Sequence, residues 1–248
     1  MTTSHAVGVD FGGSGIKGAP VDLERGDFAA DRVRIPTPDP STPEAVAEVV
    51  AELLGELEGH DGPVGITVPG VVRGGTVHTA ANIDPSWVGT EADALFARTL
   101  GRAVFAINDA DAAGLAEVRF GAARGQKGVV VVTTLGTGIG SALLHDGVLV
   151  PSSELGHVEI DGRVAETWTA NSVRERDDLS WDDWASRLTV YYRHLERLLS
   201  PDLFVVGGGV SKHAADFLPM VEIDTPIVPA LLRNKAGIVG AALHAAGD

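Results

Sequence analysis

The pattern that most constrains the fold of this chain is a strand, a glycine-rich turn and a second strand, which occurs twice. In the first copy an apolar run at residues 6–10 leads into a glycine-rich stretch at 11–18 and a second apolar run at 19–23. In the second copy a β-branched run at 129–134 leads through a glycine-rich turn to an apolar run at 141–144. Such runs are typical of paired strands joined by tight turns. Because each half of the chain carries the pattern, we expect two similar lobes.

Helical and strand segments alternate over the rest of the chain. Residues 42–57 carry apolar side chains every three or four positions, which predicts an amphipathic helix. The clearest helix is expected at 180–199, with Ser180 and Asp183 as a capping box and a buried stripe of Trp184, Leu188, Tyr191, Leu195 and Leu198. Further helices are expected at 90–100, 109–119 and 236–246, and strands at 64–68, 103–107 and 203–206. This alternation predicts an α/β protein.

Composition excludes several classes of protein. The 248 residues, 44% of them hydrophobic, are enough to bury a substantial core. The chain has no cysteine, which excludes disulfides, thiolate zinc sites, iron–sulfur ligation and a cysteine nucleophile. Acidic residues outnumber basic ones 34 to 19, and a net charge of −15 disfavours nucleic acid as a partner. No apolar run approaches the ~18 residues of a membrane span, and no signal-peptide pattern opens the chain, so we expect a cytoplasmic protein.

Residues 13–18 match the G-x-G-x-x-G pattern of dinucleotide-binding turns. That fold needs a helix to begin inside the motif, whereas the residues that follow, with Pro20 among them, favour a strand. A nicotinamide-dependent dehydrogenase therefore stays an alternative, which NADH binding would reveal. The P-loop pattern G-x-x-x-x-G-K-[ST] is absent from the sequence.

We favour two hairpin turns whose bare backbone N–H groups face a chain of phosphates. The first turn would contribute Gly12, Gly13 and Ser14, and the second Gly136, Thr137 and Gly138. Asp10 stands beside the first turn, where a carboxylate can hold Mg²⁺ through water. The alternative is that both segments are ordinary tight hairpins.

Short segments in order along nearly the whole chain resemble the ROK (repressor, open reading frame, kinase) family of sugar kinases. They lie at 9–18, 68–71, 81–83, 108–117, 135–140, 154–157 and 207–211. The resemblance implies a two-lobed actin-like ATPase (ribonuclease H-like) fold whose lobes close around a sugar. It also implies a first lobe of residues 1–108 completed by 236–248, a second lobe of 109–235, and a homodimer.

The resemblance also implies roles for individual residues. Asp109 would be the base that accepts the proton of the attacking sugar hydroxyl, and it also suits the N-cap of a helix. Amide, carboxylate and imidazole groups together match the hydroxyls of a hexose, and the expected sugar-binding residues are Asn82, Asn108, Asp109, Glu154, His157 and Glu166. Taken alone, His157 would suit a core histidine and Glu154 a solvated acid.

The phosphoryl donor is expected to contact Gly208 and Gly209 as well as both glycine turns. A polyanion that approaches a protein of net charge −15 needs local cations, for which Lys17 is the first candidate and Lys212 and Arg73 are weaker ones.

The short chain and the cysteine-free segment 164–171, which retains Glu166, resemble the branch of the family that uses inorganic polyphosphate. We therefore expect phosphoryl transfer from polyphosphate to the 6-hydroxyl of glucose, with Mg²⁺ as cofactor, possible use of ATP and no zinc. A strictly ATP-dependent glucokinase, or another hexose kinase of the family, shares every motif and stays open, as does activity on mannose or glucosamine. A sugar-responsive repressor is disfavoured, because about five residues precede the first strand where such relatives carry a helix-turn-helix segment.

Overall fold

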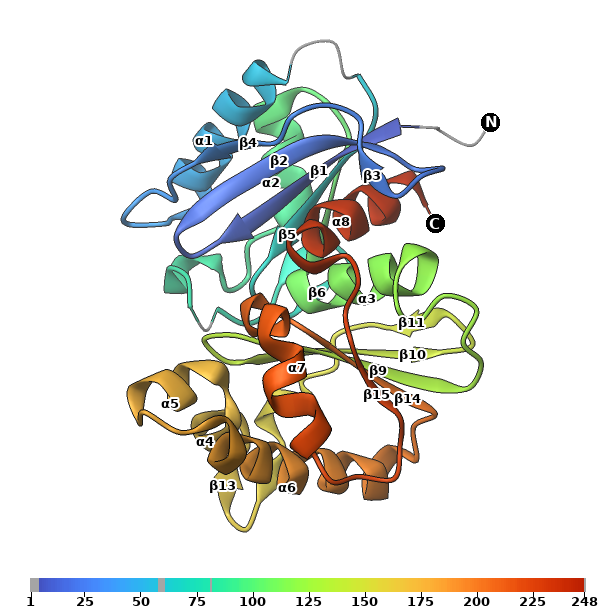
Figure 1. Ribbon diagram of the computed structural model, residues 1–248. Coiled ribbons are helices and arrows are strands. Elements are labelled where there is room, and N and C mark those ends of the chain that lie inside the picture. Colours follow the sequence, from blue (N-terminus) through green and yellow to red (C-terminus); the bar gives the residue numbers. More distant parts are fainter. Residues whose placement is uncertain (1–4, 58–60, 81, 248) are drawn as a thin grey trace. The chain divides into compact units, whose positions relative to one another are not determined.

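The computed structural model describes residues 5–57, 61–80 and 82–247, and it confirms the predicted α/β class (Figure 1). The chain forms two compact units. Unit 1 comprises Met1–Ala116 and Lys235–Asp248, and unit 2 comprises Glu117–Asn234. The division falls inside helix α3 (Asp109–Phe120), whereas the resemblance places it at the start of that helix.

The sheet of unit 1 has the strand order β3-β2-β1-β5-β8, and β4 also pairs with β2. A two-residue turn joins β1 to β2, so the glycine-rich stretch is mostly strand rather than loop. Strands β1, β5 and β8 run parallel, which brings their carboxyl ends to one edge of the sheet. The strands are β1 (His5–Gly12), β2 (Gly15–Asp22), β3 (Asp27–Phe28), β4 (Val33–Ile35), β5 (Val64–Val68) and β8 (Val104–Asn108).

Helix α1 (Pro43–Glu56) of unit 1 forms where the apolar spacing predicts it. The Thr42 hydroxyl caps its first turn by accepting the Ala45 N–H, and Pro43 occupies a first-turn position that lacks a backbone partner in any helix. Its apolar stripe packs into a core with Phe11 and Trp87. Helix α2 (Ala92–Leu100) contacts α1 and begins two residues after the predicted start.

Helix α8 (Ala236–Ala246) packs directly on strands β1 and β5, with backbone against backbone. A methyl group on Gly8 or Gly65 would overlap the carbonyl group of Ile238 or Ala241 of the helix. A methyl group on Gly240 would overlap the backbone of Ala112 in α3. Glycine is therefore required at these positions, because any side chain would push α8 away from the elements it covers.

Unit 2 repeats the hairpin arrangement of unit 1, as the duplicated pattern predicts. Strands β9 and β10 form an antiparallel hairpin, and β14 runs parallel to β9 with Gly207 opposite Thr134. The sheet order is β11-β10-β9-β14-β15, with β9 (Val129–Leu135), β10 (Ile139–His145), β11 (Val148–Val150), β14 (Leu203–Gly207) and β15 (Ile227–Pro229).

The longest helix of unit 2, α6 (Trp181–Leu199), buries most of its predicted stripe. Ser180 caps it by accepting the Asp183 N–H at 3.1 Å, and the Ser180 hydroxyl donates to the Asp183 carboxylate at 2.7 Å. The prediction for Leu198 is wrong, because its side chain is 57% exposed. In the last turn the core contact passes to Leu199, four residues after Leu195, which follows the 3.6-residue period more closely than a step of three.

Short elements connect these segments. They are β6 (Val72–Arg73), η1 (Pro85–Trp87), β7 (Thr76–Val77) and η5 (Arg233–Lys235) in or next to unit 1, and η2 (Leu155–His157), β12 (Glu159–Ile160), β13 (Arg163–Val164), α4 (Glu166–Thr169), α5 (Asn171–Arg176), η3 (Gly209–His213), α7 (Ala214–Phe217) and η4 (Leu218–Met220) in unit 2.

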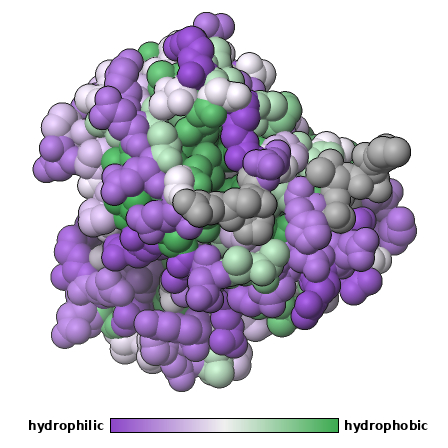
Figure 2. Space-filling model, turned by 90° about the horizontal axis from the view of Figure 1, so that it is seen from above, coloured by the Kyte–Doolittle hydropathy of each residue, from purple (hydrophilic) through white to green (hydrophobic). Residues whose placement is uncertain are grey.

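Hydrophilic side chains cover most of the surface visible in Figure 2, as the excess of acidic residues leads one to expect. Within the described part of the chain, no helix has both the length and the apolar composition that crossing a membrane requires.

Candidate functional site

The first glycine turn of unit 1 carries a carboxylate that is held from two sides. Asp10 on β1 lies opposite Lys17 on β2, and its Oδ2 is 3.3 Å from the Lys17 Nζ. Its Oδ1 accepts the Thr67 hydroxyl at 3.2 Å, and Thr67 Oγ1 in turn accepts the Phe11 N–H at 3.1 Å. The side chains of Asp10 and Lys17 are 26% and 30% exposed, so both remain within reach of a ligand.

The turn itself is fixed by side chains from the segment that follows β3. The Thr37 hydroxyl donates to the Gly12 carbonyl at 2.5 Å, and the Arg34 guanidinium donates to the Ser14 carbonyl at 3.1 Å. Arg34 on β4 lies opposite Lys17 on β2 in the antiparallel register, so two cationic residues lie beside the turn. Sequence reasoning missed Arg34 and Thr37, because the register of β4 brings Arg34 to the turn and Thr37 follows two residues after that strand.

Asn108 and Asp109 lie where β8 ends and α3 begins. Asn108 Oδ1 accepts the N–H groups of Ala110 and Asp111 at 2.8 and 3.0 Å, and Asn108 Nδ2 donates to the Gly70 carbonyl at 3.0 Å. The N-cap of α3 is therefore Asn108, and the expectation that Asp109 fills this position is wrong. Asp109 is the first helical residue, and its Oδ1 accepts the Ala110 N–H at 2.9 Å.

The remaining predicted residues of unit 1 lie on connecting segments. Asn82 is exposed, and its backbone carbonyl oxygen would lie 4.0 Å from a methyl group placed on Gly13. Arg73 is exposed at the end of β6. Ala81, which precedes Asn82 in the predicted motif, lies outside the described residues.

In unit 2 the three predicted sugar-binding side chains come together. His157 lies between two carboxylates, with its Nδ1 3.5 Å from Glu154 Oε2 and its Nε2 3.3 Å from Glu166 Oε1. Burial raises the pKa of Glu154, the neighbouring Glu166 adds to the rise, and His157 opposes it. The cluster offers acceptors and an imidazole from η2 and α4, which are separated by two short strands.

The same cluster contacts the second glycine turn. Glu166 Oε2 accepts the Ile139 N–H at 3.0 Å, and a methyl group on Gly138 would overlap this carboxylate. Ser172 holds the turn from α5, since its N–H donates to the Gly136 carbonyl at 3.0 Å and its hydroxyl donates to the Thr137 carbonyl at 2.6 Å. Sequence reasoning missed Ser172, which no pattern distinguishes from a surface serine.

The third glycine segment lies against the second turn. Gly208 has φ +83°, and a methyl group on it would overlap the backbone of Leu135 at the end of β9. Two of the predicted donor-binding segments, 136–138 and 208–209, are thus neighbours within unit 2. Lys212 follows them on η3 and is exposed. Across the described ranges, no group of three or more acidic or histidine side chains is arranged to hold a metal ion.

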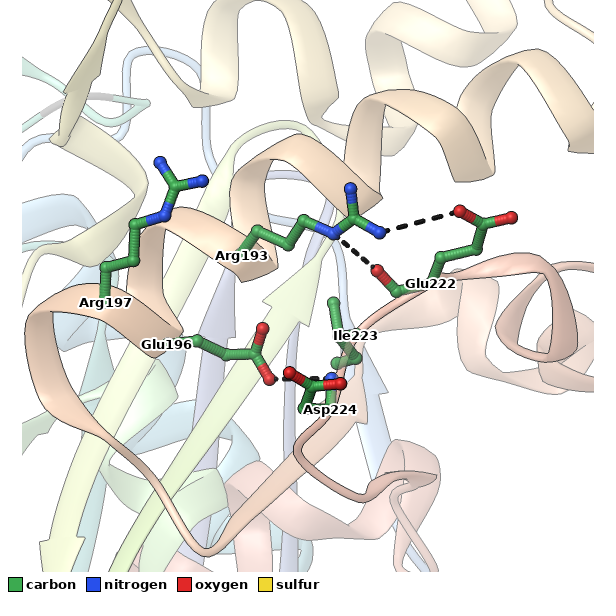
Figure 3. Close-up of a pocket in the computed structure, with 6 residues that line it drawn as sticks. All are labelled: Arg193, Glu196, Arg197, Glu222, Ile223 and Asp224. Carbon is green, nitrogen blue, oxygen red and sulfur yellow. Dashed lines mark hydrogen bonds and ion pairs between the residues drawn. The ribbon is translucent and has the colours of Figure 1, made fainter.

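An open pocket of about 690 Å³ lies elsewhere in unit 2 (Figure 3). Three of its charged side chains have partners. Arg193 donates to the Glu222 carbonyl at 2.8 Å and forms an ion pair with the Glu222 carboxylate at 3.5 Å, and Glu196 accepts the N–H groups of Asp224 and Thr225 at 3.0 and 2.6 Å. The lining contains none of the predicted site residues and consists of Arg193, Glu196, Arg197, Glu222, Ile223 and Asp224.

Comparison with known proteins gives a consistent set of matches. The model of the ROK family matches residues 6–174. A polyphosphate glucokinase from Mycobacterium tuberculosis (strain CDC 1551 / Oshkosh) is 49% identical over 248 residues, which cover 100% of this chain and 93% of the relative. A polyphosphate glucokinase from Mycobacterium leprae (strain TN) is 48% identical over 249 residues, covering 100% of this chain and 76% of the relative.

A solved structure agrees with these sequence matches. The inorganic polyphosphate/ATP-glucomannokinase from Arthrobacter sp. strain KM superposes with a TM-score of 0.94 at 55% sequence identity. The match covers 98% of this chain and 99% of that one.

Proposed function

Because this chain belongs to the ROK family, we propose that it is a sugar kinase that transfers a phosphoryl group from inorganic polyphosphate to glucose. The product is glucose 6-phosphate. The observation that carries this proposal is the likeness over the whole chain, at 48 to 55% identity, to enzymes named for polyphosphate as donor. ATP is a second donor, in line with the name of the glucomannokinase.

The Glu154–His157–Glu166 cluster supports a role in holding the sugar. A hexose hydroxyl both donates and accepts, so it is best met by carboxylate oxygens that accept and by an imidazole that can do either. The link from Glu166 to the Ile139 N–H joins this cluster to the turn that we assign to the donor. In unit 1 we assign sugar contacts to Asn82, Asn108 and Asp109, with Asn108 also fixing the start of α3 through its cap.

Asp109 is the base in the proposed reaction. The proton of the glucose 6-hydroxyl passes to the Asp109 carboxylate while the hydroxyl oxygen forms a bond to the terminal phosphorus of the chain. The bond from that phosphorus to the bridging oxygen breaks, and the shortened polyphosphate leaves with the electron pair. The protein therefore contributes mainly orientation and charge stabilisation.

Donors that can stabilise this charge are present at both glycine turns. Backbone N–H groups at Gly12, Gly13 and Ser14 and at Thr137 and Gly138 suit phosphate oxygens, because glycine lets the chain approach closely. We assign the same role to Gly208 and Gly209. The Gly136 N–H donates to the Gly138 carbonyl at 3.0 Å, so we assign Gly136 a role in shaping the turn for the donor. Lys17 adds a positive charge, and its place beside Asp10 keeps it at the first turn.

Mg²⁺ is the proposed cofactor, and Asp10 fits a role in holding it. The carboxylate is partly exposed and fixed through Thr67, and an ion that keeps most of its waters asks for no more than one or two such groups. When bound there, Mg²⁺ would neutralise charge on the phosphates. We also propose a homodimer, which light scattering of the purified protein would reveal.

The experiment that tests the proposal measures glucose 6-phosphate formed by purified protein with Mg²⁺ and either polyphosphate or ATP as sole donor. Activity with polyphosphate, alone or together with ATP, is the expected result. Activity with ATP alone would overturn the assignment of the donor, and activity with neither would overturn the assignment of the reaction.

A further inference from the structure

Beside the donor turns of unit 2, a tryptophan is enclosed by a cation and two rings. The Arg174 guanidinium lies 4.0 Å from the centre of the Trp181 ring. Phe217 stacks on Trp181 with centroids 5.8 Å apart and 19° between planes, and the His213 ring lies 5.5 Å away. We call Arg174, Trp181, His213 and Phe217 the stack. Figure 1 shows α5 and α6, which carry its first two members, on the same side of the unit 2 sheet.

The stack is tied to both glycine segments of unit 2. Arg174 lies on α5, two residues after the Ser172 that holds the Gly136–Thr137 carbonyls. His213 ends η3, which begins at Gly209, and Gly208 lies against the end of β9. The stack therefore adjoins the segments assigned to the donor phosphates.

The faces of the aromatic rings in the stack are covered by other side chains of the protein. In proteins that bind single-stranded nucleic acid, the bases stack on open aromatic faces, and each stacked base contributes to affinity. Here Arg174 covers Trp181, Phe217 lies against both Trp181 and Trp184, and the Trp184 side chain is buried. A base could stack here only by displacing one of these groups.

The polar edge of the stack suits phosphate instead. Arg174 keeps 21% of its side chain exposed, and Lys212 and His213 lie at the other end of the stack. The neighbouring acids are Glu175, 3.9 Å from Arg174, and Asp216, 3.3 Å from His213. The guanidinium Nε donates to Asn171 Oδ1 at 3.3 Å, whereas the Nη2 that pairs with Glu175 is 3.9 Å from its Oε1, beyond hydrogen-bond distance. A phosphate oxygen could therefore accept from the Nη groups.

We propose, on the basis of the function proposed above, that the stack sets the choice of phosphoryl donor. It binds phosphates that lie beyond the one transferred, and it leaves no aromatic face for a nucleoside base. The enzyme therefore favours an unbranched polyphosphate over ATP, and the preference grows with chain length.

The test compares kcat/KM for long-chain polyphosphate, tripolyphosphate and ATP, at saturating glucose, in the wild type and three variants. Arg174→Gln removes the charge and should lower kcat/KM for long chains by about tenfold, the effect of one charged hydrogen bond, with less loss for tripolyphosphate. Trp181→Ala uncovers Phe217 and His213 and should raise the ratio of ATP to polyphosphate efficiency by about fivefold or more, the value of one stacked base.

Arg176→Gln is the matched control, because Arg176 lies on the same helix, is 65% exposed and pairs with Asp177 rather than with the stack. It should leave all three efficiencies and the KM for glucose close to the wild type. Equal losses in Arg174→Gln and Arg176→Gln would show only a general effect of charge and would refute the proposal. If Trp181→Ala does not fold, the contrast between the two arginine variants still decides.

The outcomes also separate this inference from the function on which it rests. A wild type that is inactive with both donors contradicts the proposed function. If the wild type is active but none of the variants changes the ratio of polyphosphate to ATP efficiency, only the role of the stack is contradicted.

Discussion

Replacement of Gly240 by alanine should be one of the most damaging small changes in unit 1. Helix α8 packs backbone to backbone, and a methyl group on Gly240 would lie within 3.0 Å of the O, C and Cα atoms of Ala112. These atoms belong to the backbone of α3, so no side-chain rotation can relieve the overlap. Ordinary contacts of this kind measure ~3.5 Å or more, so the added methyl group and the Ala112 carbonyl oxygen would have to move apart by roughly 2 Å.

Moving α8 away from α3 would lower the free energy of unfolding, because α8 buries apolar side chains. Ile238, Val239 and Leu243 of α8 are almost fully buried against the sheet, and each would lose close packing as the helix moves. Overpacking of a well-packed core costs about 1–3 kcal/mol, and the rigid backbone on both sides places Gly240→Ala at about 3 kcal/mol. For a chain of this size that corresponds to a fall in Tm of about 6–12 °C.

Differential scanning calorimetry of Gly240→Ala and Gly55→Ala checks this prediction. Gly55 makes the matched control, because it lies in α1 with nothing within 4 Å of an added methyl group. Gly55→Ala should leave the protein as stable as the wild type or raise its stability by up to ~1 kcal/mol. A Gly240→Ala protein within about 0.5 kcal/mol of the wild type would refute the reasoning from backbone contact.

The further predictions concern three charged residues. Lys17→Glu should lower kcat/KM with polyphosphate, more for long chains than short, and an unchanged rate would remove Lys17 from the donor site. Glu117→Gln should lower the free energy of unfolding by about 1–3 kcal/mol in urea titrations, because the buried Glu117 carboxylate accepts the N–H groups of Ala122, Leu231 and Leu232. Burial raises the pKa of Glu154 above its ordinary value of 4.5, and protonation of this carboxylate removes an acceptor for the sugar. Glucose affinity, measured by calorimetry, should therefore fall as the pH drops, with a midpoint above 4.5. Glu154→Gln should abolish that step. The same raised pKa predicts that the contribution of Glu154 to the free energy of unfolding is greatest below pH 4.5 and declines as the pH rises through the raised value.

Much of the fold could be predicted because its signals are local. The helix at α8 and the strand at β5 have the predicted bounds, since a continuous apolar run defines each. The turn between β1 and β2 follows from glycine content, although both strands extend further into it than expected. Leu198 shows the limit, because which leucine of the final turn of α6 meets the core depends on the elements packed there.

Less of the candidate site could be predicted, because its links are long-range. The resemblance suggested Glu166 as a sugar ligand, but only the tertiary structure brings its carboxylate to the Ile139 N–H, 27 residues away. Arg34 reaches the first turn through the β2–β4 register, and Trp181 meets Arg174 and His213 through the packing of three separate elements. No periodicity in the sequence encodes these contacts.

The central claim is that Asp109 takes the proton from the glucose hydroxyl that attacks the phosphorus. The most direct test of this claim is the turnover of Asp109→Asn at saturating glucose and polyphosphate. An amide in place of this carboxylate keeps the size of the side chain and its acceptor for the Ala110 N–H but cannot take up the proton. Turnover should therefore fall by at least ~10²-fold while the Tm stays near that of the wild type. Turnover close to that of the wild type would contradict the role of Asp109 as the base.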